Sequence, residues 1–306
     1  MPPRILCLGM PVRDLLFRIT DLPQPGAKIR AEHVEEVSGG NAPNAAIAIA
    51  RLGGRVRLSG PIGAAHEPGT QSIFDQLNRE GIETRHLVRV DGTTTAISSI
   101  MIDATGERTA ITWRDPKLWR VKLPDAADLL DGVDAVLTEN RCAEFVTEIC
   151  TVAHARGIPV VLDADRANSL PEGLLAASSH VIFSADALRA TTGEDNLGNA
   201  LKRIAGLTTA FLAVTHGAQG VIWLDGHHAL HEMPAFPIHP VDTLGAGDVF
   251  HGAFALAIAE ALDIEAALRF SSAAAALKCT RFGGAFGAPQ RTEVEALLGH
   301  SSVKGP

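Results

Sequence analysis

The sequence has few cysteines and no run of basic residues. Its cysteines lie far apart and form no close pair of the kind that binds metals (Cys7, Cys142, Cys150, Cys279). We therefore expect reduced, mostly buried thiols in a cytoplasmic protein. There are 27 basic and 35 acidic residues, which give a net charge of −8. This balance argues against a nucleic-acid partner or an anionic membrane surface.

The sequence also lacks an apolar segment long enough to cross a membrane. The run in MPPRILCLGMPVRD is too short for a span and lacks the cleavage pattern of a signal peptide, so we read it as a buried first strand. No repeat, low-complexity segment or linker divides the chain, which predicts a single domain over 1–306. Hydrophobic residues make up 46% of the chain, which is enough for a sizeable core.

Short apolar strands alternate with amphipathic helices from residue 125 onward, which predicts βαβ units and a mostly parallel sheet. The expected strands there cover 133–138, 158–163, 180–183 and 210–215. A first strand at 4–9 is expected to end at a loop that carries Asp14. A hairpin over 219–231 is expected to turn at Asp225-Gly226.

Strand-like alternation also occurs outside this pattern, at 16–19, 29–37, 95–102 and 108–113. The segment Asp103-Ala104-Thr105-Gly106 is typical of a hairpin turn. These runs predict a small sheet beside the main core. We expect it to act as a lid, contributed by about residues 16–37 and 93–113.

The stretch Asp242-Thr243-Leu244-Gly245-Ala246-Gly247-Asp248 opens a long Ala-rich helix. Unpaired N–H groups and the helix dipole make a helix start attractive to anions, and glycines let an anion come close. A carboxylate at such a site suits a base that activates a hydroxyl for attack on a phosphoryl group. The alternative is that Asp248 only complements the helix dipole.

Two signatures resemble those of the ribokinase/PfkB family of carbohydrate kinases. One is Gly39-Gly40-Asn41-Ala42-Pro43-Asn44, which runs into a helix ending at Leu52-Gly53, and the other is 242–248 continuing to Gly252. The resemblance covers nearly the whole chain. It implies a ribokinase-like three-layer α/β/α fold with a small β-strand lid, and an ATP-dependent kinase that phosphorylates a sugar hydroxyl.

The resemblance also implies roles for residues. Asp248 would be the base, and the N–H groups of Gly245, Ala246 and Gly247 would form the anion hole. The sugar would contact Asp14, Gly39, Gly40, Asn41 and Asn44. ATP would lie near Thr215, Gly217, Gly220, Ser184, Thr243 and Ser272. Mg²⁺ would bridge the phosphates largely through water. K⁺ at the loops around Asp242 and 281–287 is left open, and a homodimer through the lid is expected.

The chain departs from the family at several positions. Many members carry Asn-x-x-Glu after the strand at 180–183, where this chain has Ser184-Ala185-Asp186-Ala187. Asp163 and Asp165, with Asp186 as a further alternative, are therefore expected to serve the metal. Asn41 stands where ribokinase itself has Lys, which argues against strict ribose specificity.

Within the family, the segments 247–253 and 276–281 are most similar to sulfofructose kinases. Arg141 matches a position where those enzymes bind an anion. Arg108, Arg114 and Arg141 are candidates to bind an acidic group, and each has a surface salt bridge as its alternative role. Trp113 either stacks on the sugar or packs the lid. The substrate is thus expected to be a ketose, a sugar acid or a sulfo-sugar.

The sequence also bears on other classes of function. A nucleoside or vitamin kinase of the same fold is the main alternative, although vitamin kinases lack the strand lid. A catalytically silent sugar-binding regulator is disfavoured by the intact stretch at 245–248. A dehydrogenase would need Gly-x-Gly-x-x-Gly after the first strand, and Gly9-Met10-Pro11-Val12-Arg13-Asp14 does not provide it. The spacing of His216, His227, His228, His231 and His251 fits no metal motif, so we assign them no chemistry.

Overall fold

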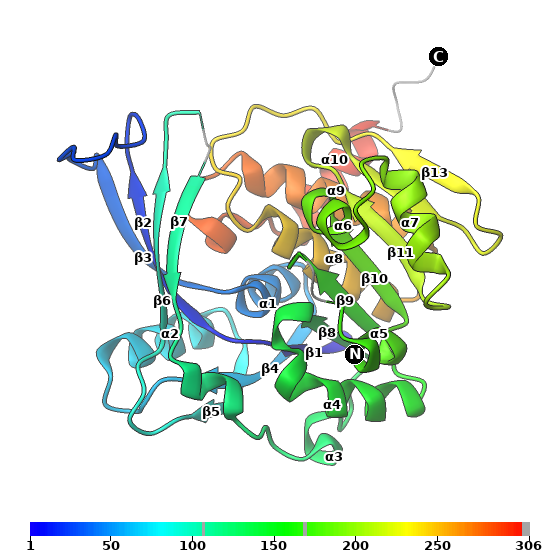
Figure 1. Cartoon of the computed structure of the whole chain (residues 1–306), viewed down its shortest axis with the longest axis horizontal. Helices are drawn as coiled ribbons and strands as arrows, with labels where there is room; N and C mark the ends of the chain where they lie inside the picture. Colours follow the sequence, from blue (N-terminus) through cyan, green and yellow to red (C-terminus); the bar gives the residue numbers. More distant parts are fainter. Residues whose placement is uncertain (106–107, 168–169, 302–306) are drawn as a thin grey trace.

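A large sheet forms the centre of the molecule. The computed structural model describes residues 1–105, 108–167 and 170–301. Within these residues the large sheet has the strand order β13-β12-β11-β10-β9-β8-β1-β4-β5 (Figure 1). Neighbouring strands from β11 to β5 are parallel, and the edge hairpin of β12 and β13 is antiparallel. The predicted α/β fold with a mostly parallel central sheet is confirmed.

The strands of the large sheet are short, as expected for buried parallel strands. They are β1 (Arg4–Leu8), β4 (Arg55–Ile62), β5 (Glu83–Arg89), β8 (Ala135–Glu139), β9 (Val160–Ala164), β10 (His180–Ser184), β11 (Phe211–Thr215), β12 (Val221–Leu224) and β13 (Leu230–Met233). The strand β5 was not predicted from the sequence. It is an edge strand rich in charged side chains (ETRHLVR), so it lacks the apolar run that marks the central strands.

Helices cover both faces of this sheet because side chains alternate along each strand. In β1, Ile5 and Cys7 join one hydrophobic core, while Leu6 and Leu8 join the other. The first core is covered by α1 (Asn41–Arg51), α2 (Pro68–Arg79), α8 (Ala246–Ala259), α9 (Ile264–Cys279) and α10 (Arg291–Ser301). The second is covered by α3 (Ala126–Leu129), α4 (Ala143–Ala155), α5 (Glu172–Ala177), α6 (Ala185–Thr192) and α7 (Leu197–Ala205).

No helix in the described part of the chain is long and apolar enough to cross a membrane.

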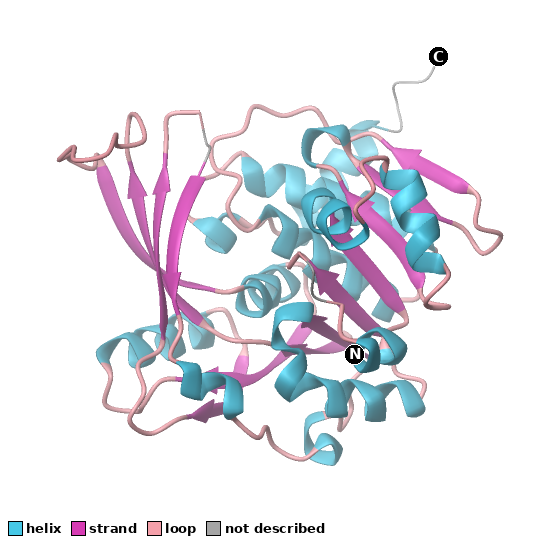
Figure 2. Cartoon of the chain, in the orientation of Figure 1, coloured by secondary structure: helices cyan, strands magenta, loops and turns pink. Residues whose placement is uncertain are grey.

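A second, small sheet stands beside the helices (Figure 2). Its order is β3-β2-β6-β7, from β2 (Val12–Arg18), β3 (His33–Gly39), β6 (Ala96–Ile102) and β7 (Arg108–Trp113). The expectation that Asp14 lies on a loop was wrong, because β2 begins only a few residues after β1 and includes Asp14. Polar residues near the start of β2 interrupt its apolar pattern, so the sequence did not indicate that the strand begins before Asp14. The predicted turn at 103–106 lies partly outside the described residues.

Candidate active site

Asp248 lies in the first turn of α8, at a helix start built on a left-handed glycine. The N-cap residue is Gly245, with φ at 76°, and it provides no side-chain cap. A residue with a Cβ rarely adopts this φ, which explains the glycine. Ala246 and Asp248 are half-buried and Gly247 is exposed, so this helix start is open to a ligand. The Ala246 N–H is partly engaged, since it donates to the Thr243 oxygen at 3.3 Å.

Asn44 holds the Asp248 carboxylate. Its Nδ2 donates to Asp248 Oδ2 at 2.7 Å. The two residues meet because α1 and α8 pack closely: a Cβ placed on Gly252 would lie only 2.6 Å from the Ala45 oxygen. Burial raises the pKa of Asp248, and the Asn44 hydrogen bond opposes this shift. A carboxylate with a raised pKa is a stronger proton acceptor once it is ionised.

Asp14 reaches the same region from the small sheet. Its carboxylate lies over Gly39 of the paired strand, because a Cβ on Gly39 would be 1.8 Å from Asp14 Oδ2. Burial raises the pKa of Asp14 to about 7, while a hydrogen bond from Ser98 and the charge of Arg114 act against the shift. The charge of Asp248 also raises this pKa, so the two carboxylates lie near enough to repel each other.

An acidic cluster lies at the carboxyl ends of β8 and β9. Asn41 Nδ2 donates to Asp163 Oδ2 at 2.9 Å and to Asp165 Oδ2 at 3.0 Å. Arg141 pairs with Asp165, and its Nε lies 3.2 Å from Glu139 Oε2. The Arg141 charge is therefore neutralised within the protein. Burial raises the pKa of Glu139 to about 8, and the charge of Arg141 opposes this.

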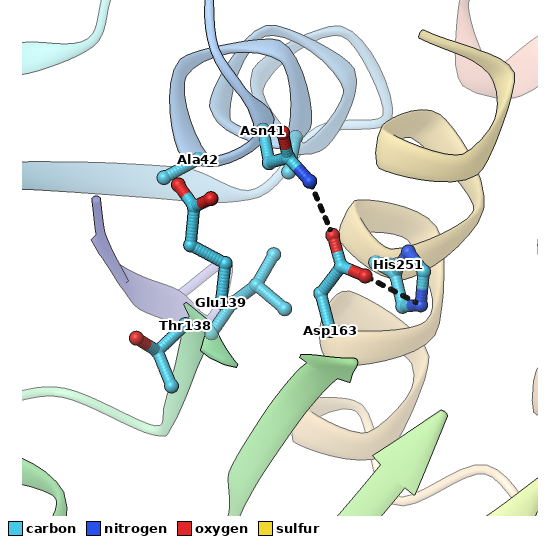
Figure 3. Close-up of a pocket in the computed structure, with 8 residues that line it drawn as sticks. Asn41, Ala42, Thr138, Glu139, Asp163 and His251 are labelled. Carbon is cyan, nitrogen blue, oxygen red and sulfur yellow. Dashed lines mark hydrogen bonds and ion pairs between the residues drawn. The ribbon is translucent and has the colours of Figure 1, made fainter. Parts of the chain in front are cut away.

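His251 and Glu139 belong to this site although the sequence reading gave neither a role. His251 Nε2 lies 3.5 Å from Asp163 Oδ1, and Asn41 binds the other oxygen of Asp163 (Figure 3). These residues line a cavity of about 10 Å³, which has room for about one water and none for a sugar. Glu139 is the last residue of the apolar strand β8, and Asp163 is the last but one of β9. A carboxylate at the end of a buried strand could have been predicted as a site residue from the sequence, whereas the residues around His251 give no such indication.

The three arginines proposed to read an acidic group differ in their partners. Arg108 Nη1 donates to Thr243 Oγ1 at 3.1 Å, and Arg141 is paired as described. Arg114 is half-buried and forms no ion pair with any other described residue; burial and the charge of Arg141 lower its pKa. Trp113, on β7, is 51% exposed, so it does not pack into a core.

Residues expected around ATP come together only in part. Ser184 and Thr215 are register partners at the ends of β10 and β11. Gly217 and Gly220 have φ values of 51° and 104°. At Gly220 a Cβ would lie 2.0 Å from the Met233 oxygen, so the hairpin itself already requires glycine there. Ser272 is half-buried on α9.

A buried lysine that the sequence reading did not single out lies behind the 242–248 stretch. Lys278, near the end of α9, has no exposed side-chain area, and its Nζ lies 3.1 Å from Asp242 Oδ2. Among the described residues, no group of three or more His, Cys, Asp or Glu side chains is arranged to hold a metal ion.

Known proteins are similar to this chain in sequence and fold. The model of the family described as "pfkB family carbohydrate kinase" matches residues 3–291. Ribokinase of Bacillus subtilis is 33% identical over 297 residues, which cover 96% of this chain and 99% of that one. A crystal structure from Agrobacterium tumefaciens, assigned provisionally as a ribokinase, is 37% identical with a TM-score of 0.94 and full coverage of both chains. Fructokinase of Xylella fastidiosa with bound ATP is 25% identical with a TM-score of 0.81, covering 98% and 99%.

Proposed function

The chain belongs to the pfkB family of carbohydrate kinases, and from this premise we propose that it transfers the terminal phosphoryl group of ATP to a sugar hydroxyl. The observation that carries the proposal is the accessible start of α8. There Asp248 is held by Asn44 beside the N–H groups that follow Gly245. A base and an anion site in this arrangement meet the two main needs of phosphoryl transfer.

The geometry suggests how the transfer proceeds. Asn44 occupies Asp248 Oδ2, which leaves Oδ1 for the sugar hydroxyl. The hydroxyl oxygen attacks the terminal phosphorus and gives its proton to Asp248, while the bond from that phosphorus to the bridging oxygen breaks and ADP leaves with the electron pair. The N–H groups of Gly245 and Gly247, with Ala246 in part, would stabilise the charge on the transferring group. Asp14, opposite them, would accept hydrogen bonds from other hydroxyls of the sugar.

The acidic cluster offers one place for a magnesium ion held through water. The Oδ1 atom of Asp165 is buried and has no hydrogen-bond partner within the described residues, as expected for a group that a bound water would satisfy. Asp163 Oδ1 is likewise buried without a hydrogen-bond partner among the described residues, 3.5 Å from His251 Nε2, so Asp163 and Asp165 both fit this role. Mg²⁺ would neutralise the charge on the ATP phosphates. Ser184, Thr215 and Thr243 would contribute hydroxyl groups on the nucleotide side.

The small sheet provides further support for a sugar kinase rather than a vitamin kinase. It brings Asp14 to the site. Arg114 directly follows β7, its charge acts on Asp14, and like Arg108 it forms no ion pair within the described residues. An acidic sugar would bind there rather than at the neutralised Arg141. Three apolar side chains are exposed on this sheet, namely Val34, Ile111 and Trp113. They would supply the apolar contact of a homodimer. Sedimentation equilibrium would test this by measuring the mass of the protein in solution.

The proposed activity is tested by ADP release from the wild-type protein in a coupled assay. The panel should include ketoses, aldoses, sugar acids, sulfo-sugars and nucleosides. We expect turnover with at least one sugar, and a preference for acidic sugars if Arg114 binds the substrate. Turnover with nucleosides alone would replace the proposal with a nucleoside kinase. No turnover with any acceptor, in a protein that still binds ATP, would favour a regulator.

The pH dependence of kcat/KM should follow the buried carboxylates. This parameter reports the free enzyme, in which the pKa of Asp14 is about 7, that of Glu139 is about 8 and that of Asp248 is raised. We expect kcat/KM to rise with pH through about 7 to a plateau, because protonated Asp14 accepts hydrogen bonds from the sugar less well. Protonated Asp248 cannot accept a proton, so its raised pKa acts in the same direction. An acid limb with its midpoint near pH ~4, the value for ordinary carboxylates, would contradict this reading.

Stability should change in the opposite direction. The folded-state pKa values of Asp14 and Glu139 lie above their unfolded values, so their contribution to the free energy of unfolding is fully present below those unfolded values. It is lost as pH rises through about 7 and 8. Melting curves across the same buffers check this sign.

A further inference from the structure

A buried ammonium group contacts the turn that precedes α8. Lys278 Nζ donates to the backbone oxygen of Asp242 at 2.6 Å and lies 3.1 Å from Asp242 Oδ2. Neither side chain is more than 1% exposed. A fully buried lysine is rare unless it is paired, because removing an ammonium group from water costs free energy.

The Asp242 carboxylate ties two segments together. Its Oδ1 accepts the Leu244 N–H at 2.8 Å, within the turn, and its Oδ2 accepts the Gly284 N–H at 3.0 Å, from the loop 283–287. The N–H groups of Val241 and Asp242 donate to the Cys279 oxygen at 2.7 and 3.2 Å, which ties the turn to the end of α9. One carboxylate thus joins α9, the turn and the loop.

These segments meet at Gly245. A Cβ placed on Gly245 would lie 3.4 Å from the amide nitrogen of Ala285, so the loop 283–287 packs directly behind the start of α8. The loop that Asp242 holds through Gly284 thus supports the backbone that carries the N–H groups of 245–247. Without the ammonium group, Asp242 would be a buried carboxylate with no counter-charge, and it would relax by binding water or a proton.

We propose that Lys278 is a positioning residue for phosphoryl transfer. Its ammonium group serves as a built-in monovalent cation that fixes Asp242, and through Asp242 the N–H groups of 245–247. The enzyme consequently needs no added monovalent cation. This inference rests on the proposed kinase function, since it assigns the anion site a task.

The test replaces Lys278 by Ala and supplies the missing cation from solution. We expect kcat to fall about 100-fold, as for a misplacement of about 1 Å, with the KM for ATP nearly unchanged. Ammonium or potassium chloride should restore kcat as its concentration rises, whereas choline chloride at equal ionic strength should not. Wild-type protein and Lys202→Ala, an exposed lysine on α7, should show no such response.

A second measurement separates this inference from the kinase proposal. Ammonium should raise the Tm of Lys278→Ala, because it binds only the folded state, and it should leave the wild-type Tm unchanged. This readout needs no turnover. The inference is overturned if Lys278→Ala keeps its kcat, if its Tm and kcat ignore small cations, or if the wild-type kcat depends on potassium or ammonium. The dependence of the wild-type kcat on cations tests the inference even if the variant does not fold. A wild-type kcat that is equal in sodium, potassium and choline chloride supports the inference.

Discussion

Replacing Asp248 by Asn is expected to lower kcat by about 10³-fold while ATP affinity changes little. General-base catalysis contributes roughly 10²–10⁴-fold to enzyme rates, and an amide cannot take the proton of the hydroxyl. The Asn44 Nδ2 group can still donate to the amide oxygen that replaces Asp248 Oδ2, so the local structure should persist. The coupled assay gives kcat, and isothermal titration with ATP gives the affinity.

The control is the same change at the next helix start. Asp263 caps α9 by accepting from the Ala266 N–H, and Asn is an equally good cap. Asp263→Asn should therefore retain both kcat and Tm. If Asp248→Asn retained most of its kcat with an unchanged Tm, Asp248 would not be the base. Its role would then be the alternative one, to complement the helix dipole.

Replacing Asp14 by Asn should lower kcat/KM for the sugar by about 10²-fold or more. A hydrogen bond to a charged group contributes about 1.5–3 kcal/mol, so the loss of two of them would weaken binding by about 10²-fold or more. The loss should appear mainly in the KM for the sugar, because Asp14 approaches the site from the small sheet rather than from α8. Initial rates over a sugar concentration series give the two parameters separately.

Gly39→Ala offers an independent route to the same effect. The new Cβ would stand 1.8 Å from Asp14 Oδ2 and must displace the carboxylate, although Gly39 itself has no reactive group. Gly206→Ala is the matched control, since its Cβ would make only an ordinary contact of 3.5 Å. A normal sugar KM in both Asp14→Asn and Gly39→Ala would remove Asp14 from the substrate site.

The fold was predictable because its signals are local. The apolar strands from β8 to β11 and the glycine-rich start of α8 are each readable within a few residues. The charged edge strand β5 and the early β2 carry weaker patterns, and they were missed or misplaced for that reason.

The site was predictable only where a motif is contiguous. Gly245 and Asp248 lie within one turn and so appear together in the sequence. Lys278 and Asp242 are 36 positions apart, and Asn41 and Asp163 are 122 apart. Their pairing follows from how α9 and β9 pack, which composition and periodicity do not encode. Arg141 was correctly placed at a strand end, yet its neutralisation by two acidic neighbours required the structure.

The two helices that carry the candidate site begin in the same way, without a side-chain cap. Both α1 and α8 start after a glycine with positive φ, Gly40 and Gly245, and neither has a side-chain cap. Glu67, Asn196 and Asp263 cap α2, α7 and α9 with their own oxygens, whereas α3, α4 and α5 also begin without a side-chain cap but after residues other than glycine. Glycine in place of a good cap costs only a few tenths of a kcal/mol, which is small against a total stability of about 5–15 kcal/mol. The starts of α1 and α8 thus lack a side-chain acceptor at a small cost in stability, and under the proposed function the oxygens of a bound substrate would accept from their N–H groups.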